Sequence, residues 1–135
     1  MGLKVINPAE LGRPKGYANG LLTPPGVRLL FVAGQIGWDG QQRLVGEDFV
    51  EQFDRALRNV LAVVREAGGA PGSVARMVVY VTDKREYAAR TAEVGERWRA
   101  LMGRHFPAMA LVQVADLLED GALVEIEATA ALGPG

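Results

Sequence analysis

The sequence contains no cysteine, and this absence removes much of the chemistry that small proteins use. Disulfides, thiol nucleophiles and thiolate metal sites are excluded. There is a single histidine, His105, so a metal site built on several histidines cannot form within one chain. The only serine, Ser73, lies in Pro-Gly-Ser-Val, which is not the pattern of a nucleophile elbow. We therefore expect no metal and no cofactor, and chemistry by carboxylates, backbone dipoles, arginines, tyrosines and water.

Long apolar runs and basic blocks are also missing. The apolar stretches at 29–33 and 77–81 are far too short to cross a bilayer, and the first ten residues lack the apolar segment of a signal peptide. We therefore expect a cytoplasmic protein that does not bind membranes. The net charge is −1 and both signs are interspersed, which gives a nucleic-acid partner no electrostatic support. The early glycines do not have the spacing of a phosphate-binding or dinucleotide-binding loop.

What the chain does have is enough apolar sequence for one domain, with 49% hydrophobic residues among 135. We expect residues 1–135 to form a single α+β domain. Asp48 with Glu51, and Asp83 with Glu86, are the capping-box patterns that begin helices. Alternation, helical periodicity and turn residues predict the order ββαβαββ, with the first two strands forming a hairpin. The predicted elements are strands at 17–22 and 28–33, a helix at 49–67, a strand at 74–82, a helix from 84 to about 103, and strands at 108–115 and 122–131.

The predicted sheet has one face that the chain itself cannot cover. Two helices can cover only one face of such a sheet. Residues 29–33 and 77–81 nevertheless carry apolar side chains on both faces, which is typical of strands buried on both sides. We therefore predict that other copies of the chain bury the second face. The alternative is a face that keeps scattered apolar residues exposed, as many monomers do.

The last predicted strand carries two carboxylates on one face. Glu125 and Glu127 are two residues apart, so their side chains lie about 7 Å from each other. Carboxylates on a face that is buried by another copy need partners or a function. One interpretation is a carboxylate that positions a water or moves a proton. The other is a solvated edge, or ion pairs with arginines across an interface.

The preceding strand alternates small and large residues. The small set, Ala108, Ala110, Val112 and Val114, is expected to fit beneath the helices. This prediction places Met109, Leu111 and Gln113 on the uncovered face.

The glycine-rich segment 34–40 is a second candidate for a site. Glycines expose backbone N–H and C=O groups to a ligand, and Gln35 and Trp38 add an amide and a ring. The alternative is a loop that needs Asp39-Gly40 only for its turn. Tyr17 would supply a hydroxyl or an aromatic wall, unless it only packs. His105, near a helix end where a cation suits the helix dipole, is better explained by structure than by catalysis.

Taken together, these segments resemble the Rid (YjgF-like, reactive-intermediate deaminase) family. The resemblance runs from about residue 5 to residue 132 and rests on the combination of short segments, each of them weak alone. The segments are Gly-Tyr-Ala-Asn-Gly at 16–20, Leu-Phe-Val-Ala-Gly-Gln-Ile at 30–36, Asn59 with Ala-Gly-Gly at 67–69, Tyr-Val-Thr-Asp at 80–83, Phe-Pro-Ala at 106–108 and Val-Glu-Ile-Glu-Ala at 124–128.

The resemblance implies a chorismate-mutase-like fold, a homotrimer whose sheets form a central barrel, and small-molecule clefts between subunits. Characterised members hydrolyse reactive enamines and imines to 2-keto acids and ammonia without a cofactor. Carried over by position, the water-positioning glutamate is Glu125, and the tyrosine of the cleft is Tyr17. The Ser-Gly-Gln segment that lines the cleft is replaced by Ala33, Gly34 and Gln35, and a helix asparagine is replaced by Thr91.

One departure from the family pattern bears on the substrate. The arginine that holds the substrate carboxylate in the family is replaced by Met109. Loss of an arginine–carboxylate pair costs about 1.5–3 kcal/mol, and an apolar wall adds desolvation. We therefore expect a ligand that is less anionic or more hydrophobic than a simple 2-imino acid, with Met109, Leu111 and Trp38 as walls. Alternatively, another arginine takes over, for which the sequence offers Arg13, Arg76, Arg90 and Arg104.

Three functions compete at this point. The leading hypothesis is a cofactor-free hydrolase or deaminase that acts on a small reactive metabolite, with Glu125 as its catalytic group. The second is a non-catalytic binding or regulatory trimer that keeps the cleft. The third is the ribonuclease activity ascribed to some relatives, which one histidine, one serine and the missing basic patch disfavour.

Overall fold

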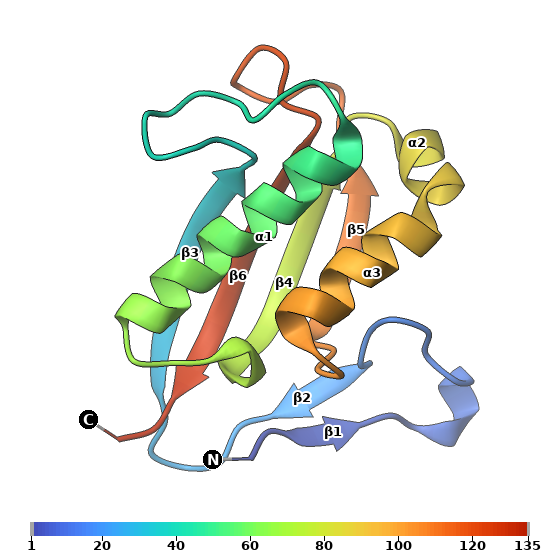
Figure 1. Cartoon of the computed structure of the whole chain (residues 1–135). Coiled ribbons are helices and arrows are strands. Elements are labelled where there is room, and N and C mark those ends of the chain that lie inside the picture. The colour runs from blue at the N-terminus through green and yellow to red at the C-terminus, as the bar shows by residue number, and fades with distance from the viewer. Residues whose placement is uncertain (1, 135) are drawn as a thin grey trace.

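The computed structural model describes residues 2–134 (Figure 1). Segments rich in strand-forming residues alternate with segments rich in helix-forming residues. Two short 3₁₀ turns (η) lie between β1 and β2 and between α1 and β4. The elements are β1 (Lys4–Ile6), η1 (Ala9–Leu11), β2 (Gly20–Leu22), β3 (Arg28–Ile36), α1 (Phe49–Glu66), η2 (Pro71–Ser73), β4 (Val74–Val81), α2 (Lys84–Ala89), α3 (Thr91–Met102), β5 (Ala108–Gln113) and β6 (Val124–Leu132).

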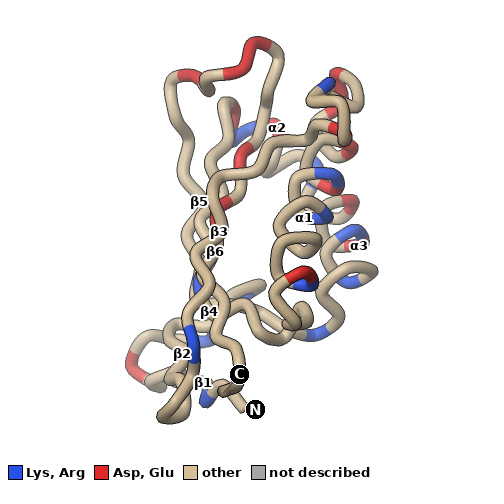
Figure 2. The backbone as a smooth tube through the Cα atoms, turned by 90° about the vertical axis from the view of Figure 1, so that its left-hand side faces the viewer, with Lys and Arg blue, Asp and Glu red and all other residues tan. Residues whose placement is uncertain are grey.

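A four-stranded mixed sheet forms the centre of the molecule. Its strand order is β3-β6-β4-β5, so β3 and β5 are the two edges. β6 is antiparallel to both of its neighbours, and β4 and β5 are parallel. α1 and α3 lie on the same side of this sheet (Figures 1 and 2). The predicted α+β domain, with its helices on one face of a mixed sheet, is confirmed.

The capped helix α1 and the sheet share the core. The Asp48 carboxylate accepts a hydrogen bond from the Glu51 N–H at 3.0 Å, as the capping pattern predicts. Leu57 on α1 and Ile126 on β6 are completely buried, together with Val79 on β4. Each such side chain contributes about 1.5–3 kcal/mol through the area that it removes from water. The core between α1 and the sheet therefore supports the loops and the edge strands that surround it.

The predicted hairpin between the first two strands is wrong. β2 pairs instead with β1, a strand that the sequence did not reveal, and the two form a separate small sheet. Side-chain and backbone contacts explain the difference. The Asn7 side chain accepts a hydrogen bond from the Asn19 N–H at 2.8 Å, and the Ala18 N–H donates to the Pro107 carbonyl at 3.0 Å. These contacts hold the segment before β2 against β5, away from β3.

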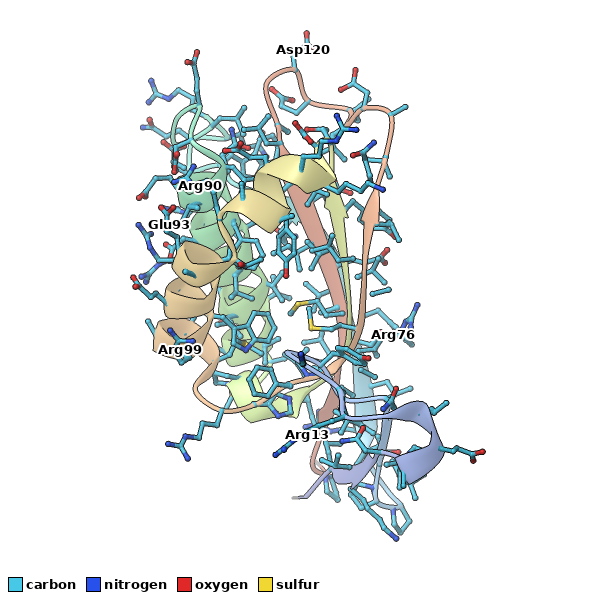
Figure 3. All side chains as sticks on the ribbon, turned by 90° about the vertical axis from the view of Figure 1, so that its right-hand side faces the viewer. Arg13, Arg76, Arg90, Glu93, Arg99 and Asp120 are labelled. Carbon is cyan, nitrogen blue, oxygen red and sulfur yellow. The ribbon has the colours of Figure 1, made fainter. Side chains whose placement is uncertain are left out.

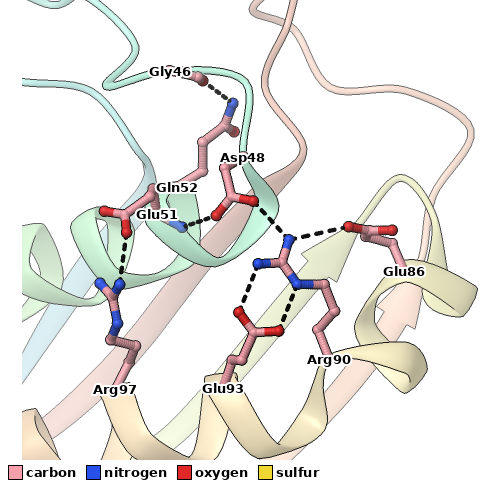
Figure 4. A network of polar contacts seen from close by, with 8 residues as sticks. All are labelled: Gly46, Asp48, Glu51, Gln52, Glu86, Arg90, Glu93 and Arg97. Carbon is pink, nitrogen blue, oxygen red and sulfur yellow. Dashed lines mark hydrogen bonds and ion pairs between the residues drawn. The ribbon is translucent and has the colours of Figure 1, made fainter.

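The predicted second helix is interrupted. It forms as α2 and α3, which meet at Arg90, whose backbone leaves the helical region at φ −125° and ψ 26°. Arg90 donates hydrogen bonds to Asp48 at 2.7 Å and to Glu93 at 2.7 and 3.0 Å, and it lies 3.3 Å from Glu86 (Figure 4). These three carboxylates come from α2, α3 and the N-cap of α1. The break therefore serves to tie both helices to the start of α1.

The prediction for the two faces of β5 is also wrong. In the parallel register, Met109 lies beside Met77 and Leu111 beside Val79, and both neighbours are completely buried under the helices. Met109 and Leu111 accordingly pack against the main core. Large side chains at these two positions occupy part of the space between β5 and α3. The small residues Ala108, Ala110 and Val112 lie on the opposite face.

That opposite face, which we call the open face, has no helix over it among residues 2–134 (Figure 2). Phe31 on β3 is 74% exposed, and Leu29 on the same strand is 55% exposed. Val112 on β5 is 41% exposed. Large apolar side chains collected on one sheet face are the feature that the sequence predicted there.

Candidate active site

A cavity of about 340 Å³ lies between α3 and β5, on the helix side of the sheet. Its volume is at the lower end of the range for small-molecule sites. Three of the residues singled out in the sequence line it, namely Thr91, Met109 and Leu111. The remaining walls are Gly16, Phe53, Val79, Tyr87, Val94, Gly95, Trp98, Arg99 and Phe106. We call this cavity the α3–β5 pocket.

Aromatic packing gives this pocket its shape. The rings of Trp98 and Phe106 stack with centroids 6.2 Å apart and an angle of 5° between their planes. The Trp98 indole N–H donates to the His105 carbonyl at 3.2 Å, which fixes the ring. Tyr87 meets Phe49 edge to face at 6.5 Å. The pocket therefore has rigid apolar walls that suit an apolar part of a ligand.

Glu125 lies on the open face, close to the edge strand β3. It pairs across the sheet with Ile36, and its carboxylate lies over Gly34. A Cβ at position 34 would be 2.4 Å from the Glu125 Oε2 atom, so any other residue there would force this side chain to shift. Glu125 is half-buried and accepts no hydrogen bond from residues 2–134. Its carboxylate is therefore free to bind a water or a substrate group.

The second carboxylate of the pair is already engaged. The Tyr80 hydroxyl donates a hydrogen bond to Glu127, and this bond raises the pKa of Tyr80. Tyr80 lies opposite Glu125 in the register of β4 and β6. The sequence left two interpretations open for these carboxylates, a structural role with a partner or a chemical role with a water or a proton. Glu127, which has a partner, fits the first, and Glu125, which has none among residues 2–134, remains a candidate for the second.

The loop after β3 is held by two side chains of α1. Asn59 donates to the carbonyls of Ile36 at 3.0 Å and of Trp38 at 2.9 Å. Gln52, which is completely buried, donates to the carbonyls of Gly46 at 2.8 Å and of Gly121 at 3.0 Å. These bonds anchor the segment that follows Gly34 to the rigid core.

The other candidates of this segment lie on β3 or in the loop that follows it. Ala33 and Gly34 are exposed on the edge strand, and the Gln35 amide donates to the Ala33 carbonyl at 3.1 Å. Trp38 is half-buried in the loop and does not line the α3–β5 pocket. The aromatic wall that the sequence assigned to Trp38 is supplied there by Trp98.

Tyr17 lies in a neighbouring cavity of about 230 Å³. Phe106 lines both this cavity and the α3–β5 pocket, and Gly16 places the chain of Tyr17 beside the latter. The His105 imidazole Nε2 is 2.6 Å from the Val74 carbonyl, to which it donates. This bond explains the only histidine as a structural residue.

The candidate residues therefore form two separate groups. Thr91, Met109 and Leu111 lie on the helix side near the β5 edge, whereas Glu125, on the inner strand β6, and Gly34, on the β3 edge, lie on the open face. β4 lies between β6 and β5, so the backbones at Glu125 and Met109 are more than about 10 Å apart and their side chains project from opposite faces of the sheet. Within one copy of residues 2–134, Glu125 cannot act on a molecule bound in the α3–β5 pocket.

Several residues of the pocket escaped sequence reasoning. Phe53, Tyr87, Val94 and Trp98 follow helical spacing and read as core residues, which they also are. Gly95 and Arg99 gave no signal of their own. A row at positions 91, 95 and 99, four residues apart, would have placed them on one side of a helix with Thr91.

Two features are absent from the described part of the chain. Within residues 2–134, no group of three or more His, Asp or Glu side chains is arranged to hold a metal ion. None of the helices in this range combines the length and the apolar content needed to cross a membrane.

Comparison with known proteins shows which family the chain belongs to. The family model described as "Endoribonuclease L-PSP" matches residues 17–132. A RutC family protein of Synechocystis sp., slr0709, is 36% identical over 134 residues, which covers 98% of each chain. The 2-iminobutanoate/2-iminopropanoate deaminase of Salmonella typhimurium is 34% identical over 105 residues, covering 76% of this chain and 78% of that protein.

Solved structures with the same fold extend the match. YyfB of Yersinia pestis, described as a protein of unknown function of the conserved Rid family, superposes with a TM-score of 0.86 at 32% identity, covering 98% of this chain and 100% of that one. Escherichia coli TdcF with bound serine superposes with a TM-score of 0.68 at 30% identity, covering 88% and 90%. On the fold, the matched residues and these relatives, the chain belongs to the Rid (YjgF-like) family.

Proposed function

We propose that the protein is a cofactor-free hydrolase of small enamines or imines, and that its active sites lie at the boundaries between the copies of a homotrimer. The observation that carries this proposal is the division of the candidate residues between the two faces of one sheet, with Glu125 and Gly34 toward the β3 edge and the α3–β5 pocket at the other edge. An edge-to-edge boundary, at which the β3 edge of one copy approaches the β5 edge of the next, brings Glu125 of one copy to the α3–β5 pocket of the other.

The open face supports association. Phe31, Leu29 and Val112 present apolar side chains that a second and a third copy would remove from water. Both sheet edges also carry unpaired backbone groups, which neighbouring copies would cover. The resemblance to the family implies that three copies associate, whereas the exposed apolar surface supports only that copies associate.

The chemistry follows from a free carboxylate beside an exposed backbone. Glu125 accepts a proton from a water, whose oxygen attacks the C=N carbon of the imine. The carboxyl group then returns this proton to nitrogen. In the resulting carbinolamine the hydroxyl proton passes to the amino nitrogen through the same carboxylate as the C–N bond breaks and the C=O bond forms, and the products are a carbonyl compound and ammonia. Water is the only co-reactant, so atoms and electrons balance without a cofactor.

Met109 favours a second candidate, a binding or regulatory trimer without turnover. The family's substrate-holding arginine is absent at this position, and Met109 packs against the core instead. Ribonuclease activity is not proposed, because the only imidazole is bonded to the Val74 carbonyl.

The decisive experiment compares Glu125→Gln with Glu127→Gln. Imines are generated in situ from amino acids by an amino-acid oxidase, and the release of 2-keto acid is measured with and without the protein. We expect wild type and Glu127→Gln to accelerate hydrolysis and Glu125→Gln to lose about 10²-fold or more. Equal activity of Glu125→Gln and wild type would overturn the assignment. Ligand-induced melting shifts without turnover would favour the binding protein.

A further inference from the structure

The α3–β5 pocket has one charged side chain, Arg99, among the described residues that line it. No carboxylate of residues 2–134 forms an ion pair or hydrogen bond with this guanidinium. Its neighbours on the same stretch of helix differ, because Arg90 binds Asp48 and Glu93, and Arg97 binds Glu51 at 2.6 Å (Figure 4). Arg99 is therefore a cation left free at an otherwise apolar cavity.

The position of this guanidinium depends on a glycine in the middle of α3. Gly95 precedes Arg99 by four residues, so the two are neighbours on the helix surface. A Cβ at position 95 would lie 3.2 Å from the Arg99 Nη1 atom. The guanidinium thus lies back over the bare backbone of Gly95. Glycine weakens a helix more than any other residue except proline, and the room it leaves for Arg99 is a reason for its presence.

Thr91 completes the polar side of the pocket. Thr91 precedes Gly95 by four residues, as Gly95 precedes Arg99, so the three form one row along α3. All three line the cavity. The Arg99 guanidinium lies over Gly95, and Thr91 lies one helical step, about 5–6 Å, beyond that glycine. A carboxylate at this end of the pocket would accept hydrogen bonds from both the hydroxyl and the guanidinium.

The opposite wall is apolar. Met109 and Leu111 of β5 face Phe53 and Trp98 across the cavity. A methionine at position 109 removes a charge from this wall and offers a flexible, polarisable surface. An apolar side chain of a ligand would bury itself here while its carboxylate stays on the α3 row.

We propose that Arg99 holds the carboxylate of the substrate from α3, and that the Met109 wall selects imines and enamines derived from amino acids with branched or aromatic apolar side chains. This inference rests on the proposed hydrolase function for the C=N group, but the carboxylate site itself does not.

The four arginines that the sequence offered as replacements are placed elsewhere. Arg90 is saturated by its carboxylates, and Arg104 lines the cavity of Tyr17. Arg76 lies on the open face, on the far side of the sheet from Arg99 (Figure 3). Arg13 lies between η1 and β2 and does not line the pocket. Arg99 takes the role that Met109 cannot fill.

Binding tests the carboxylate site without any turnover. Titration calorimetry compares 4-methylpentanoate with its neutral amide, and 4-methyl-2-oxopentanoate with pyruvate. We expect the acid to bind at least about 10-fold more tightly than the amide, and the larger keto acid more tightly than pyruvate. Arg99→Gln should weaken binding of the acid by about 10- to 100-fold and leave the amide unchanged. Arg85→Gln, at an exposed arginine of α2, is the matched control.

Gly95→Ala separates position from charge. Alanine raises helix propensity, so the melting temperature should stay equal or rise. The displaced guanidinium should nevertheless bind the acid several-fold more weakly. Equal affinity of wild type and Arg99→Gln for the acid, or equal affinity of wild type for acid and amide, would overturn the proposal.

Kinetics distinguish this inference from the proposed function. Hydrolysis of the imines of leucine and phenylalanine by wild type should exceed that of the alanine imine, and Arg99→Gln should raise KM with little change in kcat. If Arg99→Gln leaves turnover unchanged, the role of Arg99 is contradicted and the proposed hydrolase function still holds. Selective binding of 4-methylpentanoate without turnover would remove the hydrolase and leave the carboxylate site.

Discussion

The carboxylate of Glu125 lies against the backbone of Gly34, at a distance that leaves no room for a Cβ. This contact joins the last strand to an edge strand. It explains why a glycine stands in the middle of β3, where it weakens strand formation. Two residues that are 91 positions apart in the chain are thereby fitted to each other.

We predict that Gly34→Ala impairs catalysis while the fold is kept. The new methyl group would meet the Glu125 carboxylate at 2.4 Å, so this side chain must move from its position. We expect kcat for imine hydrolysis to fall by about 10²-fold, the loss typical of a displaced acid–base group. Gly133→Ala, where a Cβ meets nothing within 4 Å, is the control. Full activity of Gly34→Ala would show that the fit of Glu125 to Gly34 is irrelevant to chemistry.

Met109→Arg should broaden activity toward small imino acids. An arginine at this position would supply a second cation to the α3–β5 pocket and would shorten the apolar wall. We expect kcat/KM for the alanine imine to rise by about 10- to 100-fold and that for the leucine imine to fall. Met109→Leu, which keeps the wall apolar, should leave this ratio near that of wild type. An unchanged ratio in Met109→Arg would contradict the role given to this wall.

Phe31→Asp should dissociate the assembly. Phe31 is 74% exposed on the open face, so a charge there costs the isolated copy little but opposes its burial by another copy. We expect sedimentation to report a trimer for wild type and a folded single copy for the variant, with loss of hydrolysis. Leu118→Asp, at a completely exposed side chain outside the sheet, should remain trimeric. If the wild-type protein sediments as one copy, the proposed site between copies is wrong.

Gln52→Leu should destabilise the protein through unpaired backbone groups. The amide of Gln52 binds the carbonyls of Gly46 and Gly121, and its oxygen accepts from the Leu123 N–H at 2.8 Å. Leucine fills a similar volume but takes away the hydrogen-bond partner of these three backbone groups. We expect a loss of about 2–4 kcal/mol in the free energy of unfolding, measured in urea. The exposed Gln41→Leu should change it by less than about 0.5 kcal/mol.

Acid should weaken the helix network around Arg90. Hydrogen bonds from Arg90 hold the pKa values of Asp48 and Glu93 below their ordinary values of 3.8 and 4.5. Carboxyl groups with a lowered pKa stabilise the folded state fully above the ordinary value, and this contribution is lost as the pH falls through the folded one. Urea midpoints of wild type should therefore fall below pH about 4.5, and those of Arg90→Gln should fall less steeply. Parallel curves for both proteins would contradict this account.

Much of the fold was predictable because its signals are local. The capping pattern at Asp48 and the helical spacing of Phe53, Leu57 and Val60 depend on neighbours within a few residues. The pairing of β2 with β1 was not predictable, because it depends on Asn7 and Asn19, which are brought together by the rest of the chain. The prediction of which sheet face carries Met109 was wrong for a related reason. Whether large or small side chains face the helices depends on how α3 packs over β5, which is a relation between distant residues.

The sequence by itself determined most of the elements, the starts of α1 and α2, the family and the candidate Glu125, because each of these resides in residue types and short spacings. The tertiary structure alone decided that Glu125 and Met109 lie on opposite faces of one sheet. It also decided that Arg99 is the free cation of the pocket. Strand order and ion pairing are relations between distant residues, and only the packed chain, which buries some partners and leaves others free, establishes them.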